Sequence, residues 1–196
     1  MEIIKKLKDL NFNSNNTAIL CVDCQNGFTL RCENELPVNG TNEDWINSVN
    51  NFLFSAKKEN YLIIASKDDH PENHISFNTW PPHCIKGTYG NELFINQYDY
   101  LVKKGTTEST DSYSAFYEDI NLKNSNGLEE FLKEKNIKKL AILGLAGDVC
   151  VLATIKTALE KNFEVVVLND YIKSVNEKDM EYILNSENLI DNIKIL

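Results

Sequence analysis

The sequence predicts an α/β fold with a mainly parallel central sheet. Short apolar runs alternate along the chain with amphipathic stretches of helical period. Parallel strands are buried on both faces, so they read as nearly continuous apolar runs, and helices must connect them. The chain has 196 residues, without an internal repeat or a linker, so a single domain over residues 1–196 is expected.

The expected elements follow one another in regular order. Strands are expected at 17–23, 61–67, 99–104, 138–145 and 163–170, with an edge strand at 192–196. Helices are expected at 43–60, 126–136, 148–162 and 177–187. Two longer irregular segments, 24–42 and 68–98, interrupt the alternation. Long loops in a compact domain are often functional, and open α/β sheets bind ligands beyond the carboxyl ends of their strands.

Charge and composition exclude several classes of partner. The net charge of -9 disfavours nucleic acid, whose phosphates would be repelled. The N-terminus lacks the apolar core of a secretory signal, and no run approaches the ~20 apolar residues that span a membrane. Five irregularly spaced cysteines suit free thiols in a reducing cytoplasm. Cys21 and Cys24 form a C-x-x-C within a strand, where a redox pair is not expected.

Three reactive side chains stand where strands end. Asp23 follows the first strand, Lys104 ends the third, and Cys150 opens a helix after the fourth. The positive end of a helix lowers the pKa of a thiol, and nearby N–H groups can stabilise an oxyanion. Asp23 could accept the thiol proton and Lys104 could stabilise the charge. Taken singly, each also fits an ordinary role: a strand-end cap, a solvated lysine and a small buried apolar residue.

All three histidines lie in one segment, KDDHPENHISFNTWPPHC, at 67–84. Asp68 and His70 are two residues apart in extended chain, so they point to the same side. One carboxylate and two imidazoles suit Zn²⁺, Fe²⁺ or Mn²⁺. Spacing alone does not choose between His74 and His83 as the second imidazole, and a polar loop with ordinary histidines is the alternative.

Six segments carry a family resemblance, in the same order over nearly the whole chain. They are VDCQNGF (22–28), ELPVNG (35–40), KDDHPENHISF (67–77), WPPHCIKGTYG (80–90), KKG with DSYSAF (103–116), and GLAGDVCV (144–151). Together they resemble the nicotinamidase/pyrazinamidase group of the isochorismatase-like cysteine hydrolases. The resemblance implies a three-layer, doubly wound sandwich around the parallel sheet.

The resemblance also implies a site and a reaction. The catalytic triad would be Asp23, Lys104 and Cys150, and one divalent metal would be bound by Asp68, His70 and His83. Zinc is the expected metal, with iron or manganese as alternatives. The reaction would convert nicotinamide to nicotinic acid and ammonia through a cysteine thioester, in NAD salvage, and pyrazinamide should be cleaved too. The alternatives are another small-amide hydrolase of the family and a non-catalytic ligand-binding member.

Further residues receive roles from the same resemblance. Phe28, Trp80 and Tyr113 would line an aromatic pocket, and the amides of Ala146 and Cys150 would form the oxyanion hole. The Leu145–Ala146 peptide is expected to be cis. His74 would support the metal ligands.

The sequence departs from similar ones at three positions. They often have an acidic residue at the position of Gly27, an aromatic one at that of Asp69, and threonine at that of Gly147. Gly147 is expected to loosen the turn before the nucleophile. Asp69 would add negative charge near the metal if it points that way. The sequence leaves open whether the protein forms a homo-oligomer.

Overall fold

The protein is an α/β sandwich around a six-stranded parallel sheet in the computed structural model, which describes residues 2–196. The strand order is β3-β2-β1-β4-β5-β6, and every adjacent pair is parallel. The strands are β1 Thr17–Val22, β2 Leu62–Asp68, β3 Tyr100–Lys104, β4 Lys139–Leu145, β5 Glu164–Lys173 and β6 Ile193–Ile195. The predicted parallel sheet is confirmed.

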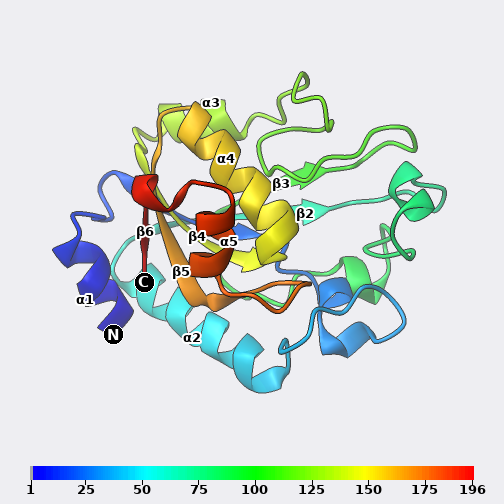
Figure 1. Ribbon diagram of the computed structural model, residues 1–196, viewed down its shortest axis with the longest axis horizontal. Coiled ribbons are helices and arrows are strands. Elements are labelled where there is room, and N and C mark those ends of the chain that lie inside the picture. The colour runs from blue at the N-terminus through cyan, green and yellow to red at the C-terminus, as the bar shows by residue number, and fades with distance from the viewer. Residues whose placement is uncertain (1) are drawn as a thin grey trace.

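Helices cover both faces of the sheet, which gives the three layers that the resemblance implied. Figure 1 shows α3 and α4 on one side of the strands and α1 and α2 on the other, with α5 beside β5. Right-handed crossovers place helices this way when the strand order runs outward in both directions from the centre. The helices are α1 Glu2–Asp9, α2 Glu43–Lys58, α3 Leu128–Glu134, α4 Leu152–Glu160 and α5 Met180–Ser186.

The central strands are buried on both faces. All six residues of β1 are buried, and in β4 only Lys139 is partly exposed. Both strands therefore lack the alternation of apolar and polar residues that a half-exposed strand shows. Within the described part of the chain, no helix is long and apolar enough to cross a membrane.

Asparagine marks where each of these helices ends. Two residues beyond the last helical residue, an asparagine takes a left-handed conformation with φ between 56 and 63°, at Asn11, Asn60, Asn136, Asn162 and Asn188. Asparagine tolerates this conformation better than most residues, and it is a common terminator of helices. At the other end, the Asn42 side chain accepts a hydrogen bond from the Trp45 amide and caps α2.

Two elements differ from the sequence prediction. Helix α1 was not predicted, because its eight residues are mostly polar and present only a narrow buried stripe, Ile4 and Leu7. The helix predicted over 148–162 begins as a π-helical turn, Gly147–Val151, and becomes α-helical at Leu152. Single π turns often occur at functional sites.

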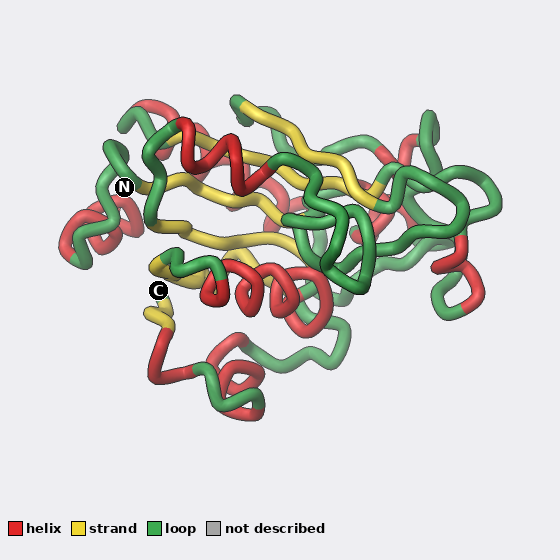
Figure 2. The backbone as a smooth tube through the Cα atoms, turned by 90° about the horizontal axis from the view of Figure 1, so that it is seen from above, coloured by secondary structure: helices red, strands yellow, loops and turns green. Residues whose placement is uncertain are grey.

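The long loops gather at the carboxyl ends of the strands. Figure 2 shows them at one end of the sheet, with both termini toward the other end. Segments 23–42 and 69–99, which follow β1 and β2, contain only short 3-10 turns. The sheet therefore directs these segments, and the turn after β4, toward the same edge.

Gly144 lets β1 and β4 approach each other closely. Its φ is +124°, and a Cβ on it would lie 2.0 Å from the carbonyl oxygen of Val22. We expect Gly144→Ala to lower the free energy of unfolding by more than about 2 kcal/mol, because backbone atoms must move apart. Urea denaturation measures this.

The control is Gly127→Ala. That glycine also has positive φ, +87°, but a Cβ there meets no atom within 4 Å. Gly127→Ala should lower the free energy of unfolding by only about 1 kcal/mol, the effect of the left-handed backbone alone. Equal losses in the two variants would contradict the role of close strand approach.

Candidate active site

The sheet register brings four sequence-predicted residues together. Asp68 and Lys104 are the last residues of β2 and β3 and are direct partners in the parallel ladder. Asp23 follows β1, which pairs with both β2 and β4. Cys150 lies in the π turn after β4. Residues distant in sequence therefore meet at one edge because parallel strands all end there.

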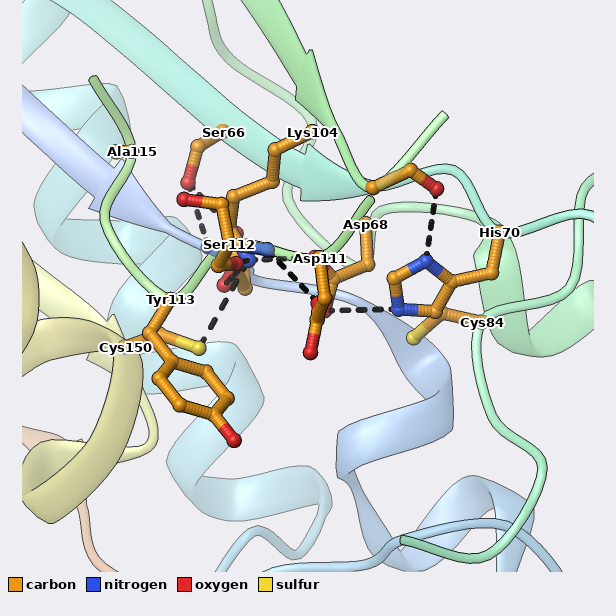
Figure 3. Close-up of polar contacts among 12 residues, drawn as sticks. Ser66, Asp68, His70, Cys84, Lys104, Asp111, Ser112, Tyr113, Ala115 and Cys150 are labelled. Atoms are coloured by element: carbon orange, nitrogen blue, oxygen red, sulfur yellow. Dashed lines mark hydrogen bonds and ion pairs between the residues drawn. The ribbon is translucent and has the colours of Figure 1, made fainter. Parts of the chain in front are cut away.

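Lys104 lies at the centre of this group, fully buried (Figure 3). Its Nζ is 2.5 Å from Asp68 Oδ1, 3.0 Å from Asp23 Oδ2 and 3.8 Å from Cys150 Sγ, and it donates to the Ser112 carbonyl at 2.8 Å. Burial alone would lower its pKa, but the two carboxylates outweigh burial and raise the pKa well above the usual value. The side chain is a fixed buried cation.

Asp23 is held by β2. Ser66 Oγ donates to Asp23 Oδ1 at 2.7 Å and accepts from the Asp23 amide at 3.2 Å, and Asp23 itself has a left-handed φ of 46°. Burial raises the pKa of Asp23, although Lys104 opposes the rise. Among residues 2–196, no well-aligned hydrogen bond reaches Oδ2, which lies against Lys104. This oxygen can therefore take up a proton.

Cys150 does not have the lowered pKa expected from its place at a helix start. Burial raises its pKa well above the usual value, and the negative charges of Asp23 and Asp68 add to the rise, while Lys104 opposes it. The thiol is thus the resting form, and ionisation needs a base, for which Asp23 is placed. A Cβ at Gly147 would lie 2.3 Å from Ser174 Oγ, so a larger residue would require Ser174 to move.

Asp68, His70 and His83 form a buried trio with the character of a metal site. Their ligand atoms lie within 4.8 Å of one another. His70 Nδ1 is 3.0 Å from the Gly105 carbonyl and His83 Nδ1 is 2.7 Å from the Pro81 carbonyl. These bonds fix each ring with Nδ1 as donor, the arrangement typical of metal-binding histidines. His70 Nε2 lies 3.6 Å from Asp68 Oδ2, and against the effect of burial this carboxylate raises the pKa of His70.

The electrostatics of this region also favour a cation. One buried ammonium, Lys104, faces two buried carboxylates, Asp23 and Asp68, so negative charge is in excess. Burial lowers the pKa of His83, so its ring is neutral near pH 7 and able to bind a metal. The residues present therefore fit one divalent metal ion.

His74 lies beside the trio but has both nitrogens engaged. Its Nδ1 is 2.7 Å from Ser76 Oγ, and its Nε2 is 2.7 Å from the Thr110 carbonyl. Its ring stacks on His70, with centroids 3.7 Å apart. His70, His74 and Asp111 form a second trio of ligand atoms, yet binding through His74 would break an existing hydrogen bond. The geometry therefore makes His74 a support for His70.

Asp69 points away from the metal trio. Its carboxylate accepts from Lys103 Nζ at 2.9 Å and from Asn91 Nδ2 at 3.2 Å, and Lys67 Nζ lies 3.7 Å away. Burial would raise the pKa of Asp69, but these partners outweigh burial and lower the pKa. Asp69 therefore adds little charge to the site, and it anchors the loop instead.

A pocket reaches Cys150 and the trio of Asp68, His70 and His83, while Asp23 and Lys104 lie outside its lining. The predicted aromatic residues Phe28, Trp80 and Tyr113 line it, together with Cys150, the metal trio and Ala146. It encloses about 450 Å³, its open mouth included. The Trp80 indole donates to the Tyr113 hydroxyl at 3.4 Å, which joins two walls. The Leu145–Ala146 peptide is cis, as expected.

The sequence did not reveal four residues that hold the site. They are Ser66 and Ser112, which bind Asp23 and Lys104, and Gln25 and Asn91, whose side chains bind the Asp68 carbonyl at 2.8 Å each. Gln25 also accepts from the Asp68 amide at 2.8 Å. Only Ser66 gave a signal, as a polar residue in an otherwise apolar strand. The others lie in loops whose course the sequence does not specify.

Comparisons with known proteins show what this chain is similar to. Residues 17–188 match the isochorismatase domain family. The nicotinamidase of Acinetobacter baylyi is 31% identical over 83% of this chain and 84% of its own. A structure of Pyrococcus horikoshii pyrazinamidase in complex with zinc superposes with a TM-score of 0.80 and 32% identity, over 92% of this chain and 98% of that one. PnC1 from L. infantum, solved with nicotinate, gives 0.79 and 31%, over 94% and 93%.

Replacement of His83, a member of the metal trio, and of His74, which lies beside it, should have different effects on Zn²⁺ binding. We expect His83→Ala to weaken Zn²⁺ binding by more than about 100-fold, because a ligand is lost. His74→Ala should weaken it by only about tenfold, through a less firmly held His70. Competition with a chromogenic chelator measures both affinities, and elemental analysis of wild-type protein should give about one metal per chain. The reverse order would exchange the two roles.

Proposed function

This chain belongs to the isochorismatase domain family, and we propose that it hydrolyses nicotinamide to nicotinic acid and ammonia, with Cys150 as nucleophile. One observation carries the proposal. Cys150 and the Asp68, His70 and His83 group line one small pocket with aromatic walls, and Lys104 and Asp23 lie behind Cys150, outside the pocket lining. Nicotinamide is a flat ring with two matching features. Its carboxamide suits attack by Cys150, and its ring nitrogen suits a metal held by Asp68, His70 and His83.

The first half of the reaction forms a thioester. Asp23 takes the proton of the Cys150 thiol, and Lys104 stabilises the thiolate. The sulfur attacks the carboxamide carbon, and the C=O electron pair moves onto oxygen, held by the amides of Ala146 and Cys150. The C–N bond then breaks as Asp23 returns its proton to nitrogen, and ammonia leaves.

The second half releases the acid. A water molecule gives a proton to Asp23 while the water oxygen attacks the thioester carbon. The C–S bond breaks, nicotinic acid leaves, and the proton returns to the sulfur of Cys150. Lys104 faces the sulfur throughout and lowers the energy of each thiolate state.

The remaining residues orient the substrate. When bound by Asp68, His70 and His83, a divalent metal would supply an electrophilic site for the ring nitrogen, with zinc proposed and iron or manganese as alternatives. Phe28, Trp80 and Tyr113 would flank the ring. Because the carboxamide is held over Cys150, the effective concentration of the thiolate at the carboxamide carbon is large.

Another small-amide hydrolysis is the alternative, because the reaction centre alone does not specify the ring. Pyrazinamide has a ring nitrogen in the same relation to its carboxamide, so we propose that it is cleaved as well. A substrate panel that includes aliphatic amides, with ammonia release as the readout, separates these possibilities. Faster turnover of an aliphatic amide than of nicotinamide would overturn the proposed substrate.

We also propose a cytoplasmic enzyme without a nucleic-acid partner. All five cysteines are free, which fits a reducing compartment, and the net charge is -9. Nicotinic acid formation would serve NAD salvage.

The nucleophile has a direct test. We expect Cys150→Ala to lower kcat for ammonia release from nicotinamide on the order of 10⁴-fold or more, because Cys150 is the only cysteine among the described residues that line the pocket. Cys21→Ala, at a buried cysteine within β1, is the control and should keep nearly full activity. Thermal melting checks that both variants fold. Substantial turnover by folded Cys150→Ala would contradict the assignment.

The proposed role of Asp23 as the base can be tested through the pH profile of kcat/KM. The Ser66 hydrogen bond lowers the pKa of Asp23, against the rise caused by burial. Ser66→Ala should therefore raise that pKa further. Because the base acts as a carboxylate, the acidic limb of kcat/KM against pH should move to higher pH.

Ser114→Ala is the matched control for this variant. It removes a buried hydroxyl whose hydrogen bonds are to Thr157 Oγ1 at 2.9 Å and from the Phe116 amide at 3.3 Å, and not to Asp23. Its acidic limb should stay in place. An unmoved limb in Ser66→Ala would count against Asp23 as the base.

A further inference from the structure

We propose that Glu35 is a positioning residue for the metal site, and that its carboxylate fixes the segment that carries His83. The inference rests on the proposed metal site of Asp68, His70 and His83. Glu35 lies in the first long loop, far in sequence from all three. It does not line the pocket, so it would act through the backbone at Cys84.

The Glu35 carboxylate binds the residue next to a metal ligand. Its Oε2 accepts a hydrogen bond from the Cys84 amide at 2.8 Å. Cys84 is fully buried and has a left-handed φ of 50°, an unusual conformation for this residue. A buried amide that loses its acceptor destabilises the local conformation. The acceptor therefore helps to keep the backbone turned at Cys84, and this turn sets the position of the His83 ring.

The same peptide segment is tied to the other imidazole. The Cys84 carbonyl accepts from the His70 amide at 3.3 Å and from Asn91 Nδ2 at 3.0 Å. The Lys86 amide donates to the His70 carbonyl at 2.8 Å. Displacement at Cys84 would therefore change the separation of His70 and His83, which a three-ligand site must hold closely.

Two glycines make room for this carboxylate. A Cβ on Gly90 would lie 1.9 Å from Glu35 Oε1, and a Cβ on Gly27 would lie 2.3 Å from Oε2. The Glu35 carboxylate thus occupies a slot between two backbones that no other residue type would leave open. The slot joins the loop after β1, through Gly27, to the turn at Gly90, whose neighbour Asn91 binds the Asp68 carbonyl at 2.8 Å.

The test is the Zn²⁺ affinity of the purified protein, measured by chelator competition. Glu35→Ala should bind Zn²⁺ about 10- to 100-fold more weakly, the usual effect of losing a group that orients a ligand. Glu35→Gln keeps an acceptor and should lose less, on the order of fivefold, because a neutral acceptor bonds more weakly. Glu33→Ala, two residues away and exposed, is the control and should match wild type.

A rescue separates positioning from general stability. In Gly27→Asp with Glu35→Ala, the Cβ of the new aspartate would lie 2.3 Å from the place that Oε2 held, 3.0 Å from the Gly90 carbonyl oxygen and 3.1 Å from Cys84 Sγ. Its carboxylate therefore reaches the same slot and should recover much of the lost Zn²⁺ affinity. In Gly27→Asp alone, the two side chains compete for one slot and affinity should fall. Loss of folding without loss of affinity in the folded fraction would assign Glu35 a merely structural role.

Gly90→Ala provides a second route if Glu35→Ala does not fold. It retains Glu35 but displaces its carboxylate, and Zn²⁺ affinity should fall as in Glu35→Ala. Gly87→Ala, in the same loop, is its control: no atom lies within 4 Å of its Cβ, but its φ is +83°, so it tests backbone strain without displacement of Glu35. Wild-type affinity in folded Glu35→Ala or Gly90→Ala would overturn the inference. A wild-type protein that binds no metal would instead overturn the proposed function.

Discussion

The buried ammonium of Lys104 is the interaction on which the site depends. It contacts the carboxylates of Asp23 and Asp68 and faces the sulfur of Cys150. An unpaired charge at this depth would be strongly unfavourable, so the cation and the two anions require one another. The same ammonium links the proposed chemistry to the proposed metal site, because Asp23 belongs to the first and Asp68 to the second. Its position couples the two halves of the pocket.

The fold supplies this interaction through strand register. Asp68 and Lys104 are ladder partners at the ends of β2 and β3, and Asp23 extends the neighbouring strand. Loops alone would not hold three charges so closely without water. The loops contribute a second kind of control, since Gln25, Asn91 and Glu35 bind the backbone at Asp68 and at Cys84, beside the proposed metal ligands. Rigid strands therefore place the charges, and polar loop side chains place the imidazoles.

Opposing forces set the protonation states of the site. Burial disfavours every charged form, and raises the pKa of both Asp23 and Cys150. The position of Cys150 near a helix start predicted a lowered pKa, but a helix dipole contributes less than full burial near two carboxylates. A thiol that stays protonated until a base removes its proton is consistent with a nucleophile that becomes reactive only beside a bound substrate.

The sequence by itself determined the parallel sheet, most element positions, and the residues at the strand ends, because apolar periodicity is a local property. Spacing alone left open whether His74 or His83 lies with Asp68 and His70, and where Asp69 points. In the structure Asp68, His70 and His83 lie together, hydrogen bonds to Ser76 and Thr110 occupy His74, and Lys103 and Asn91 hold Asp69. The hydrogen bonds of Ser66 to Asp23 and of the Cys84 amide to Glu35 are also visible only in the folded chain. Hydrogen bonds between residues far apart in sequence depend on how the loops pack, and no local pattern encodes that packing.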